Sequence, residues 1–171
     1  MNDIIPNARS AIRDSSGDSI SIAISIESPL SDDVRALVAA LNETTLALTP
    51  REHTHHMSAE QMAQPDTTLF VAREDGRAVA MGALRRHGRG VAEVKRMYTL
   101  PSHQGRGIGR AILARIEQLA RKEGFARLVL ETGSNFDAAC HVYAASGFSP
   151  CGPVLDYPPS AWTAFYAKVL A

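Results

Sequence analysis

A glycine-rich junction between a strand and a helix is the feature of this sequence that most constrains its fold. Residues 91–100 are typical of a strand, and Pro101 ends it because proline has no N–H for a sheet. Gly105, Gly107 and Gly109 follow, and an apolar stripe at helical spacing comes after them. Each glycine in a helix costs about 1 kcal/mol relative to alanine, so three at a helix start need a compensating interaction. Free N–H groups at a helix start bind anions, and glycines let phosphates approach the backbone, so the junction predicts a pyrophosphate site.

Neighbouring residues narrow the identity of that ligand. Arg106 and Arg110 add charge-assisted donors, which favour an anion. A Walker-type loop requires Gly-Lys-Ser/Thr, whereas Gly109 is followed by Arg110 and Ala111. The dinucleotide pattern G-x-G-x-x-G lacks its third glycine. A nucleotide triphosphatase and a nicotinamide oxidoreductase are therefore both disfavoured.

Apolar periodicity predicts a chain of alternating strands and helices. Isoleucines occupy every second position from 20 to 26, which is the period of a strand with one buried face. Asp75-Gly76 separates two β-rich runs, as in a tight antiparallel hairpin. The other predicted elements are helices over 32–48, 50–62, 108–123 and 138–145, and strands over 68–73, 78–85, 128–130 and 164–169. This pattern is typical of a mixed α/β (α+β) fold.

Charge and composition disfavour several classes of protein. The 171 residues contain 18 Lys and Arg against 18 Asp and Glu, so no net charge attracts nucleic acid or an anionic membrane. The N-terminus lacks the apolar core of a signal peptide, and no apolar run approaches the ~20 residues that span a bilayer. Residues 1–18 are polar and aperiodic, which predicts a mobile N-terminal extension before a single domain over 19–171. Two cysteines are too few for a disulfide scaffold and favour a cytoplasmic location.

The glycine loop also carries a family resemblance. The motif Gln-x-x-Gly-x-Gly at Gln104, Gly107 and Gly109 resembles the coenzyme A pyrophosphate loop of the GNAT superfamily of acetyl-CoA-dependent N-acetyltransferases. The flanking segments carry counterparts of other family motifs: Thr99-Leu100-Pro101 before the loop, and Ala139, Tyr143 and Gly147-Phe148 after it. The ending Cys151-Gly152-Pro153 with Asp156-Tyr157 looks like a bacterial subgroup that acts mostly on small molecules.

This resemblance implies a fold, a cosubstrate and a set of binding residues. The fold is a mostly antiparallel twisted sheet with helices on both faces, and acetyl-CoA is the cosubstrate, with no metal required. The implied acetyl-CoA contacts are Met97, Tyr98 and Thr99 along the pantetheine arm, Gln104, Gly105, Arg106, Gly107, Ile108, Gly109 and Arg110 in the loop, and Asn135, one residue before the family's usual asparagine.

Two residues are candidates for proton transfer. An amine of pKa about 10 is neutral in only about one molecule in a thousand at pH 7, so a base helps acyl transfer. By resemblance Glu93, eleven residues before Gln104, is that base, and the alternative is a surface glutamate paired with a neighbouring cation. Tyr143 matches the residue that protonates the leaving thiolate, and the alternative is an aromatic in the core. Glu131 either binds the substrate amine or caps the following loop.

The resulting hypothesis is acetyl transfer to a primary amine of a small molecule or amino-acid derivative by direct attack. The rival hypothesis is a coenzyme A-binding regulatory module without efficient turnover. His53, His55 and His56 lack a cysteine or carboxylate cluster at ligand spacing, which disfavours a metal site, and any of them is a candidate for the acceptor pocket. The apolar C-terminal segment with Trp162 and Phe165 is a candidate for a homodimer contact.

Overall fold

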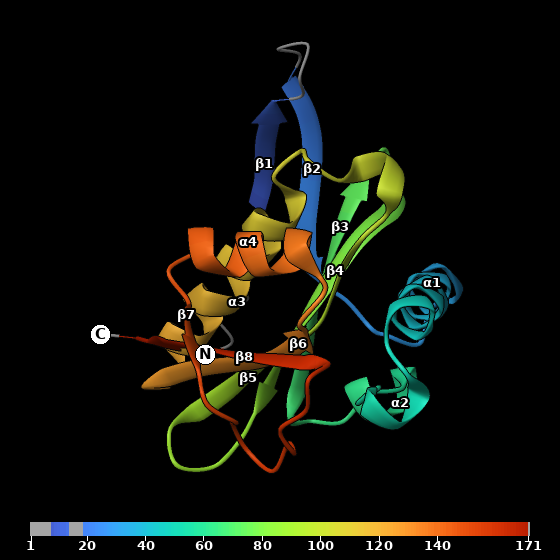
Figure 1. The fold of residues 1–171 in the computed structure, drawn as a ribbon. Helices are drawn as coiled ribbons and strands as arrows, with labels where there is room; N and C mark the ends of the chain where they lie inside the picture. Colours follow the sequence, from blue (N-terminus) through green and yellow to red (C-terminus); the bar gives the residue numbers. More distant parts are fainter. Residues whose placement is uncertain (1–7, 14–18, 171) are drawn as a thin grey trace.

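Eight strands form one sheet in the part of the chain that the computed structural model describes, residues 8–13 and 19–170 (Figure 1). Their order is β1-β2-β3-β4-β5-β6-β8-β7, and all neighbours pair antiparallel except β5 and β6, which are parallel. The strands are β1 Ala8–Arg13, β2 Ser19–Ile26, β3 Thr67–Glu74, β4 Arg77–Arg86, β5 Val91–Thr99, β6 Arg127–Gly133, β7 Ser149–Cys151 and β8 Thr163–Val169. The prediction of a mostly antiparallel sheet is confirmed.

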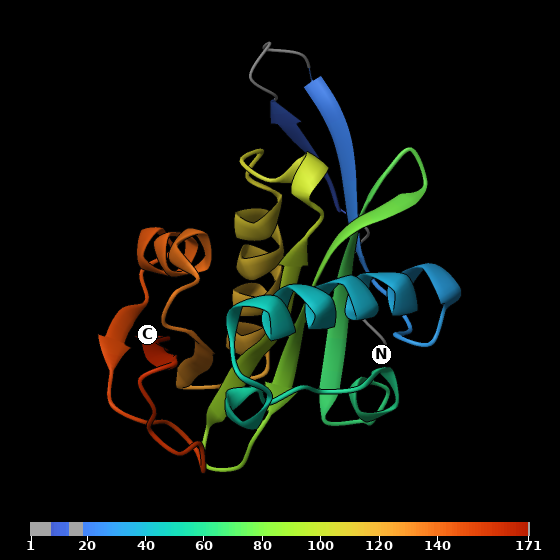
Figure 2. The ribbon, with the colours of Figure 1, turned by 45° about the vertical axis from the view of Figure 1, so that its right-hand side comes forward.

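Helices cover both faces of this sheet, as the resemblance implies (Figures 1 and 2). They are α1 Asp32–Leu48, α2 Ala59–Met62, α3 Ile108–Lys122 and α4 Asp137–Ala145, with single 3-10 turns at Arg51–His53 and Pro101–His103. Alternate residues of β3 divide between the faces because successive strand side chains point in opposite directions. Leu69 and Val71 pack in the cluster that contains α1, whereas Phe70 and Ala72 pack in the cluster that contains α3. No helix in the described residues is long and apolar enough to cross a membrane.

Two predictions about the first third of the chain need correction. Residues 8–13, predicted to belong to a mobile extension, form β1 and pair with β2 in the register Ala8↔Ile24; the remainder of 1–18 lies outside the described residues. The predicted helix over 50–62 is a 3-10 turn, an extended linker and the short α2, which Ser58 and Gln61 start with reciprocal capping bonds. Pairing with β2 forms β1, and the capping bonds of Ser58 and Gln61 fix where α2 begins. The hydropathy pattern of the sequence indicates neither feature.

The strand β5 separates from β6 part-way along its length while it stays paired with β4, and this separation creates the space for a site. It pairs with β6 only from Val91↔Arg127 to Glu93↔Val129, after which β6 continues beside β8 alone. On its other edge the register with β4 shifts by one residue, and Arg96 at the shift has a φ of +57°. Such a bulge bends the strand and re-aims its side chains. A Cβ on the facing Gly82 would lie 2.7 Å from Cγ2 of Ile112, so the close approach of α3 requires glycine there.

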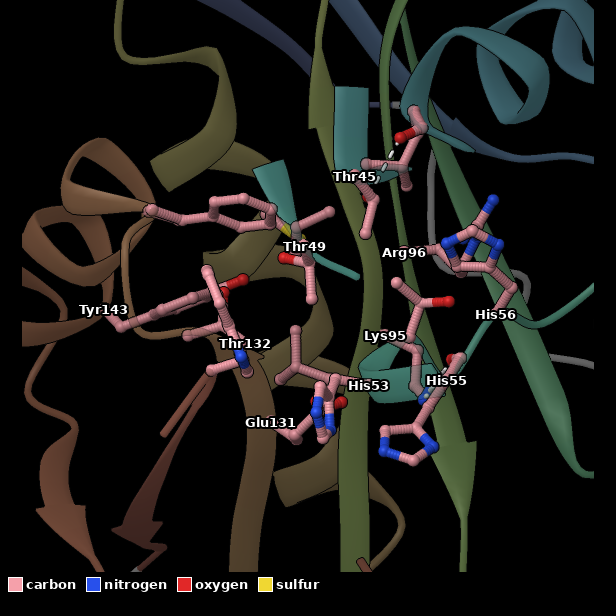
Figure 3. Close-up of a pocket in the computed structure, with 18 residues that line it drawn as sticks. Thr45, Thr49, His53, His55, His56, Lys95, Arg96, Glu131, Thr132 and Tyr143 are labelled. Carbon is pink, nitrogen blue, oxygen red and sulfur yellow. Dashed lines mark hydrogen bonds between the residues drawn. The ribbon is translucent and has the colours of Figure 1, made fainter. Parts of the chain in front are cut away.

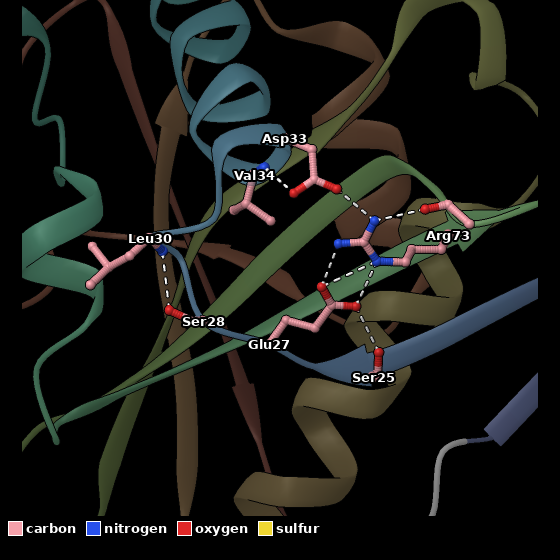
Figure 4. A network of polar contacts seen from close by, with 8 residues as sticks. Ser25, Glu27, Ser28, Leu30, Asp33, Val34 and Arg73 are labelled. Atoms are coloured by element: carbon pink, nitrogen blue, oxygen red, sulfur yellow. Dashed lines mark hydrogen bonds and ion pairs between the residues drawn. The ribbon is translucent and has the colours of Figure 1, made fainter.

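A polar network anchors the start of α1 to the sheet (Figure 4). Arg73 on β3 donates from Nη2 to Glu27 at 2.7 Å, from Nη1 to Asp33 in the first turn of α1 at 2.6 Å, and also to the carbonyl of Gly76 at 2.8 Å. The hydrogen bond from Arg73 holds the pKa of Asp33 below its ordinary value. The network therefore fixes the entry of α1 through charge-assisted bonds to one guanidinium.

We expect Arg73→Gln to lower the free energy of unfolding by about 1–2 kcal/mol at neutral pH, since the Arg73–Glu27 pair is partly shielded from water and the more exposed Asp33 pair adds little. Because the folded-state pKa of Asp33 is depressed, its contribution is present above the ordinary value of 3.8 and disappears as pH falls through the lower folded value. Urea unfolding at pH 7 and in acid measures both effects. Arg85→Gln, which breaks one exposed pair with Asp66, is the control, and an equal loss in that variant would contradict the network.

Candidate active site

A cavity of about 130 Å³ occupies the place where β5 and β6 separate (Figure 3). Its walls come from α1, residues 53–56, the bulged part of β5, the end of β6, and α4. Figure 3 shows Arg96, His55 and His56 on one side of β5, and Glu131 and Tyr143 on the other. The cavity therefore joins side chains that are far apart in the sequence.

Glu131 is the acidic side chain that lines this cavity. It lies on β6 two residues beyond Val129, the last position of β6 that pairs with β5. Burial raises the pKa of its carboxyl, and nearby Glu93 raises it further, while Lys95 opposes both effects. A carboxylate at a cavity wall can accept a proton, and a raised pKa makes it a stronger base.

Glu93, predicted to be the base that accepts the amine proton directly or through a water, is buried beside the cavity rather than at its wall. Its side chain is 1% exposed and is not among the residues that line the cavity. Tyr157 donates to its Oε1 at 2.6 Å, His87 Nε2 lies 2.9 Å from its Oε2, and Lys95 Nζ lies 3.4 Å from its Oε1. Glu93 is covered because it sits where β5 and β6 are still paired, and its catalytic role stays a prediction.

Tyr143 on α4 lines the cavity and also packs in the core. Its ring meets Phe148 edge-on at a centroid distance of 6.0 Å. Burial raises the pKa of its phenol, so the hydroxyl keeps its proton at neutral pH. Tyr143 is therefore an aromatic residue of the core, and its place at the cavity is also compatible with the predicted role of proton donor.

The β5 side of the cavity carries cations that the sequence reasoning did not assign to the site. The Arg96 side chain donates from Nη2 to Asn42 Oδ1 at 2.6 Å and to the Val38 carbonyl at 3.3 Å, and burial lowers its pKa to about 10. Lys95 is the cation beside Glu93. Burial also lowers the pKa of His56, with Arg96 lowering it further. Only the bulge brings Arg96 here, and no periodicity in the sequence indicates it.

The histidines at 53, 55 and 56 all line the cavity, and their place in an acceptor pocket stays a prediction. Burial lowers the pKa of His55, assisted by Lys95 and His53. Within the described residues no group of three His, Cys, Asp or Glu side chains is arranged to hold a metal ion.

The glycine loop joins β5 to α3 with the backbone that the pyrophosphate prediction requires. Gly105 and Gly107 have φ of +75° and +78°, and the Gly107 carbonyl accepts the N–H of Ala111 at 3.0 Å, which begins the helix. The first N–H groups of α3 therefore have no acceptor inside the helix. A Cβ at Gly105 or Gly107 would meet nothing within 4 Å, and one at Gly109 would come no closer than 3.8 Å to Thr99 Oγ1. This open cradle of N–H groups fits the pyrophosphate of acetyl-CoA.

Side chains of the loop mostly hold the loop itself. Gln104 donates to the carbonyl of Thr99 at 3.1 Å, and the guanidinium of Arg106 pairs with Glu74 on β3. Glu74 therefore competes with the predicted anion for the Arg106 side chain. Arg110 is exposed on the first turn of α3.

The other predicted acetyl-CoA contacts do not all lie at the cavity. Met97 lines the cavity, Tyr98 packs on the α1 side of the sheet, and Thr99 ends β5 beside the loop. Asn135 donates to the carbonyl of Leu48 at 2.9 Å and so ties the start of α4 to the end of α1. Contact of these residues with acetyl-CoA stays a prediction.

Comparison with known proteins decides the family. The model of the acetyltransferase (GNAT) family matches residues 36–148. An IAA acetyltransferase of Azospirillum brasilense is 37% identical over 150 residues, which are 87% of this chain and 98% of the relative. The chain belongs to the GNAT family. An uncharacterized N-acetyltransferase of Bacillus subtilis, YsnE, is 34% identical over 80% of this chain and 93% of its own.

A solved structure supports the same assignment at the level of the fold. A putative acyl-CoA N-acyltransferase from Klebsiella pneumoniae superposes with a TM-score of 0.76 at 28% identity, covering 88% of this chain and 98% of the other. This GNAT protein is therefore an enzyme, an N-acetyltransferase of a family that uses acetyl-CoA as cosubstrate. The predicted family, fold class and enzyme class are confirmed.

The apolar C-terminal segment of this GNAT enzyme is less available for a partner than the sequence suggested. Phe165 is buried in its own chain against Val129 and Val154, so it does not offer a dimer contact. Trp162 is 39% exposed and lies at the rim of the cavity. A homodimer stays a prediction.

Proposed function

We propose that this enzyme transfers the acetyl group of acetyl-CoA to a primary amine of a small molecule, and that the acceptor binds in the cavity between β5 and β6. The observation that carries the proposal is the position of Glu131 at the wall of this cavity, on the strand that separates from the predicted acetyl-CoA arm. The volume of about 130 Å³ suits a small acceptor better than a folded polypeptide. We further propose that residues 19–171 form one domain, to which β1 at 8–13 adds a strand, and that this domain acts in the cytoplasm, where unpaired Cys140 and Cys151 are expected.

Different residues of the chain bind acetyl-CoA and transfer the protons of this reaction. Acetyl-CoA supplies an acetyl thioester when it is bound. The N–H groups at the start of α3 hold its pyrophosphate, and β5 positions the arm toward the cavity. Glu131 takes the proton of the amine, because it is the carboxylate that reaches the cavity and its pKa is raised. Tyr143 supplies a proton from Oη to the leaving thiolate.

We expect Tyr143→Phe to lower kcat by about tenfold with little change in acetyl-CoA affinity, since a thiolate of pKa about 8.5 needs only modest help to leave. Steady-state kinetics and calorimetry on the same preparation measure the two quantities. If affinity and thermal stability fall together with kcat, Tyr143 acts through core packing with Phe148 and Tyr166 instead.

The proposal as a whole is tested by coenzyme A release with a panel of primary amines, alongside calorimetric binding of acetyl-CoA. Amine-dependent release of coenzyme A, with an acetylated product identified by mass spectrometry, is the expected result. Tight binding without release for every amine would contradict the proposal and favour the regulatory module.

A further inference from the structure

We propose that the acceptor of this enzyme carries a carboxylate as well as an amine, and that Arg96 binds the carboxylate. This inference rests on the proposed acetyl transfer and specifies its substrate class as free amino acids. The carboxylate would lie on the β5 side of the cavity and the amine toward Glu131 on the β6 side (Figure 3).

The first argument is that Arg96 combines a strained backbone conformation with a buried charge. Its backbone has a φ of +57°, a conformation that an L residue other than glycine adopts only with strain. Its side chain is buried, and its relative exposure is 8%. The described residues give it two neutral oxygen partners, from Val38 and Asn42, and no carboxylate. Its Nε is buried without a hydrogen-bond partner among them. A buried guanidinium with a donor to spare is suited to an anionic ligand.

The second argument is that the rest of the cavity does not supply that anion. The nearest carboxylate on β5, Glu93, already binds Lys95 at 3.4 Å, His87 and Tyr157. Glu131 lies across the cavity on β6. On the same side as Arg96 the cavity is lined by His55 and His56, and an imidazole supplies no negative charge to offset the guanidinium. The β5 side of the cavity is therefore positive.

The third argument is that acetyl-CoA does not need a cation at this place. Its pyrophosphate is assigned to the N–H groups at the start of α3, and the pantetheine arm that follows carries no charge. The positive side of the cavity is therefore left for the acceptor. An amino acid has the matching polarity, because its carboxylate fits the guanidinium fork of Arg96 and its ammonium group faces Glu131.

The test compares free α-amino acids with their carboxamides, in which the amine is kept and the carboxylate is neutral. For the wild-type enzyme we expect kcat/KM to be at least about tenfold higher for the acids than for the amides. Arg96→Gln should lower kcat/KM for the acids by about 10²-fold, mainly through KM, and leave the amides within about twofold. Arg35→Gln, a matched change of an exposed arginine on α1, should leave both unchanged.

Two further variants separate substrate binding from support of α1. Asn42→Ala removes a neutral partner of Arg96 and keeps the guanidinium, so the preference for acids should survive. Arg96→Lys keeps a cation without the fork, so a reduced preference should remain even if Arg96→Gln folds poorly. If Arg96 only tied β5 to α1, Asn42→Ala and Arg96→Gln would instead lower the rates with acids and amides alike.

The outcomes also separate this inference from the proposed function. Equal wild-type rates with acids and amides would overturn the carboxylate assignment while leaving amine acetylation intact. Faster acetylation of an amine that bears a phosphate, such as phosphoethanolamine, would overturn the choice of a carboxylate. Binding of acetyl-CoA with no acetylation of any amine would overturn the proposed function together with this inference.

Discussion

Glu131→Gln is expected to lower kcat by on the order of 10²–10⁴ at neutral pH, with little change in acetyl-CoA affinity. The change keeps the shape of the side chain and removes the carboxylate that we propose as the base at the cavity. As pH rises toward the pKa of the acceptor amine, free amine becomes abundant and the variant should converge on the wild type. In the wild type, kcat/KM should increase as pH passes upward through the raised pKa of Glu131, because only the deprotonated carboxylate acts as a base.

Glu93→Gln is the matched comparison, because Glu93 and Glu131 lie on adjacent strands. Loss of the Glu93 charge leaves Lys95 buried without its ion-pair partner, so we expect a loss of stability of about 3 kcal/mol or more. Its pH–rate profile should run parallel to that of the wild type. Convergence at high pH in Glu93→Gln, and parallel curves in Glu131→Gln, would assign the base to Glu93 acting through Tyr157, Lys95 or a water.

Gly109→Leu is expected to weaken acetyl-CoA binding by about a hundredfold while leaving the protein folded. Gly109 has no positive φ, and a Cβ there meets only Thr99 Oγ1 at 3.8 Å, so the folded protein itself does not require glycine. Gly109 is the second residue of α3, and replacing a glycine in a helix favours the helix by up to about 1 kcal/mol. A larger side chain instead occupies the approach of the pyrophosphate to the N–H groups, whose charge-assisted bonds contribute about 1.5–3 kcal/mol each.

Calorimetric affinity and thermal unfolding together check this prediction. Gly88→Leu is the control, since Gly88 also has open space around it and lies in the hairpin between β4 and β5. Gly107→Leu is a less clean variant, because its φ of +78° adds backbone strain to any effect on the ligand. Unchanged affinity in folded Gly109→Leu would remove the glycine loop from the binding of acetyl-CoA.

Local patterns predicted most of the elements because each pattern is decided by neighbours in the chain. The apolar stripe of α3 is buried at the predicted spacing, and the hairpin at Asp75-Gly76 joins β3 and β4. The strand β1 escaped prediction because its pairing with β2 is what forms it. The three-residue β7 escaped for the same reason, and it also contains Pro150, which disfavours a strand.

The candidate site shows the same division between local and tertiary information. The loop from Gln104 to Arg110 could be found from the sequence, because a strand end, glycines and a helix start are contiguous and their backbone chemistry is local. The prediction for Glu93 relied on a distance along the chain, and that distance does not report that β5 and β6 are still paired at Glu93 and have separated by Glu131.

The sequence by itself determined the mixed fold, the glycine cradle at the start of α3 and, through its motifs, the family. These depend on periodicity, backbone conformation and contiguous residues, which one chain carries in its order. The tertiary structure alone decided which side chains share the cavity. A bulge of one residue re-aims Arg96, and the end of one short parallel pairing places Glu131 at the cavity and leaves Glu93 behind it. Both events depend on pairing between strands distant in sequence, and no local pattern encodes them.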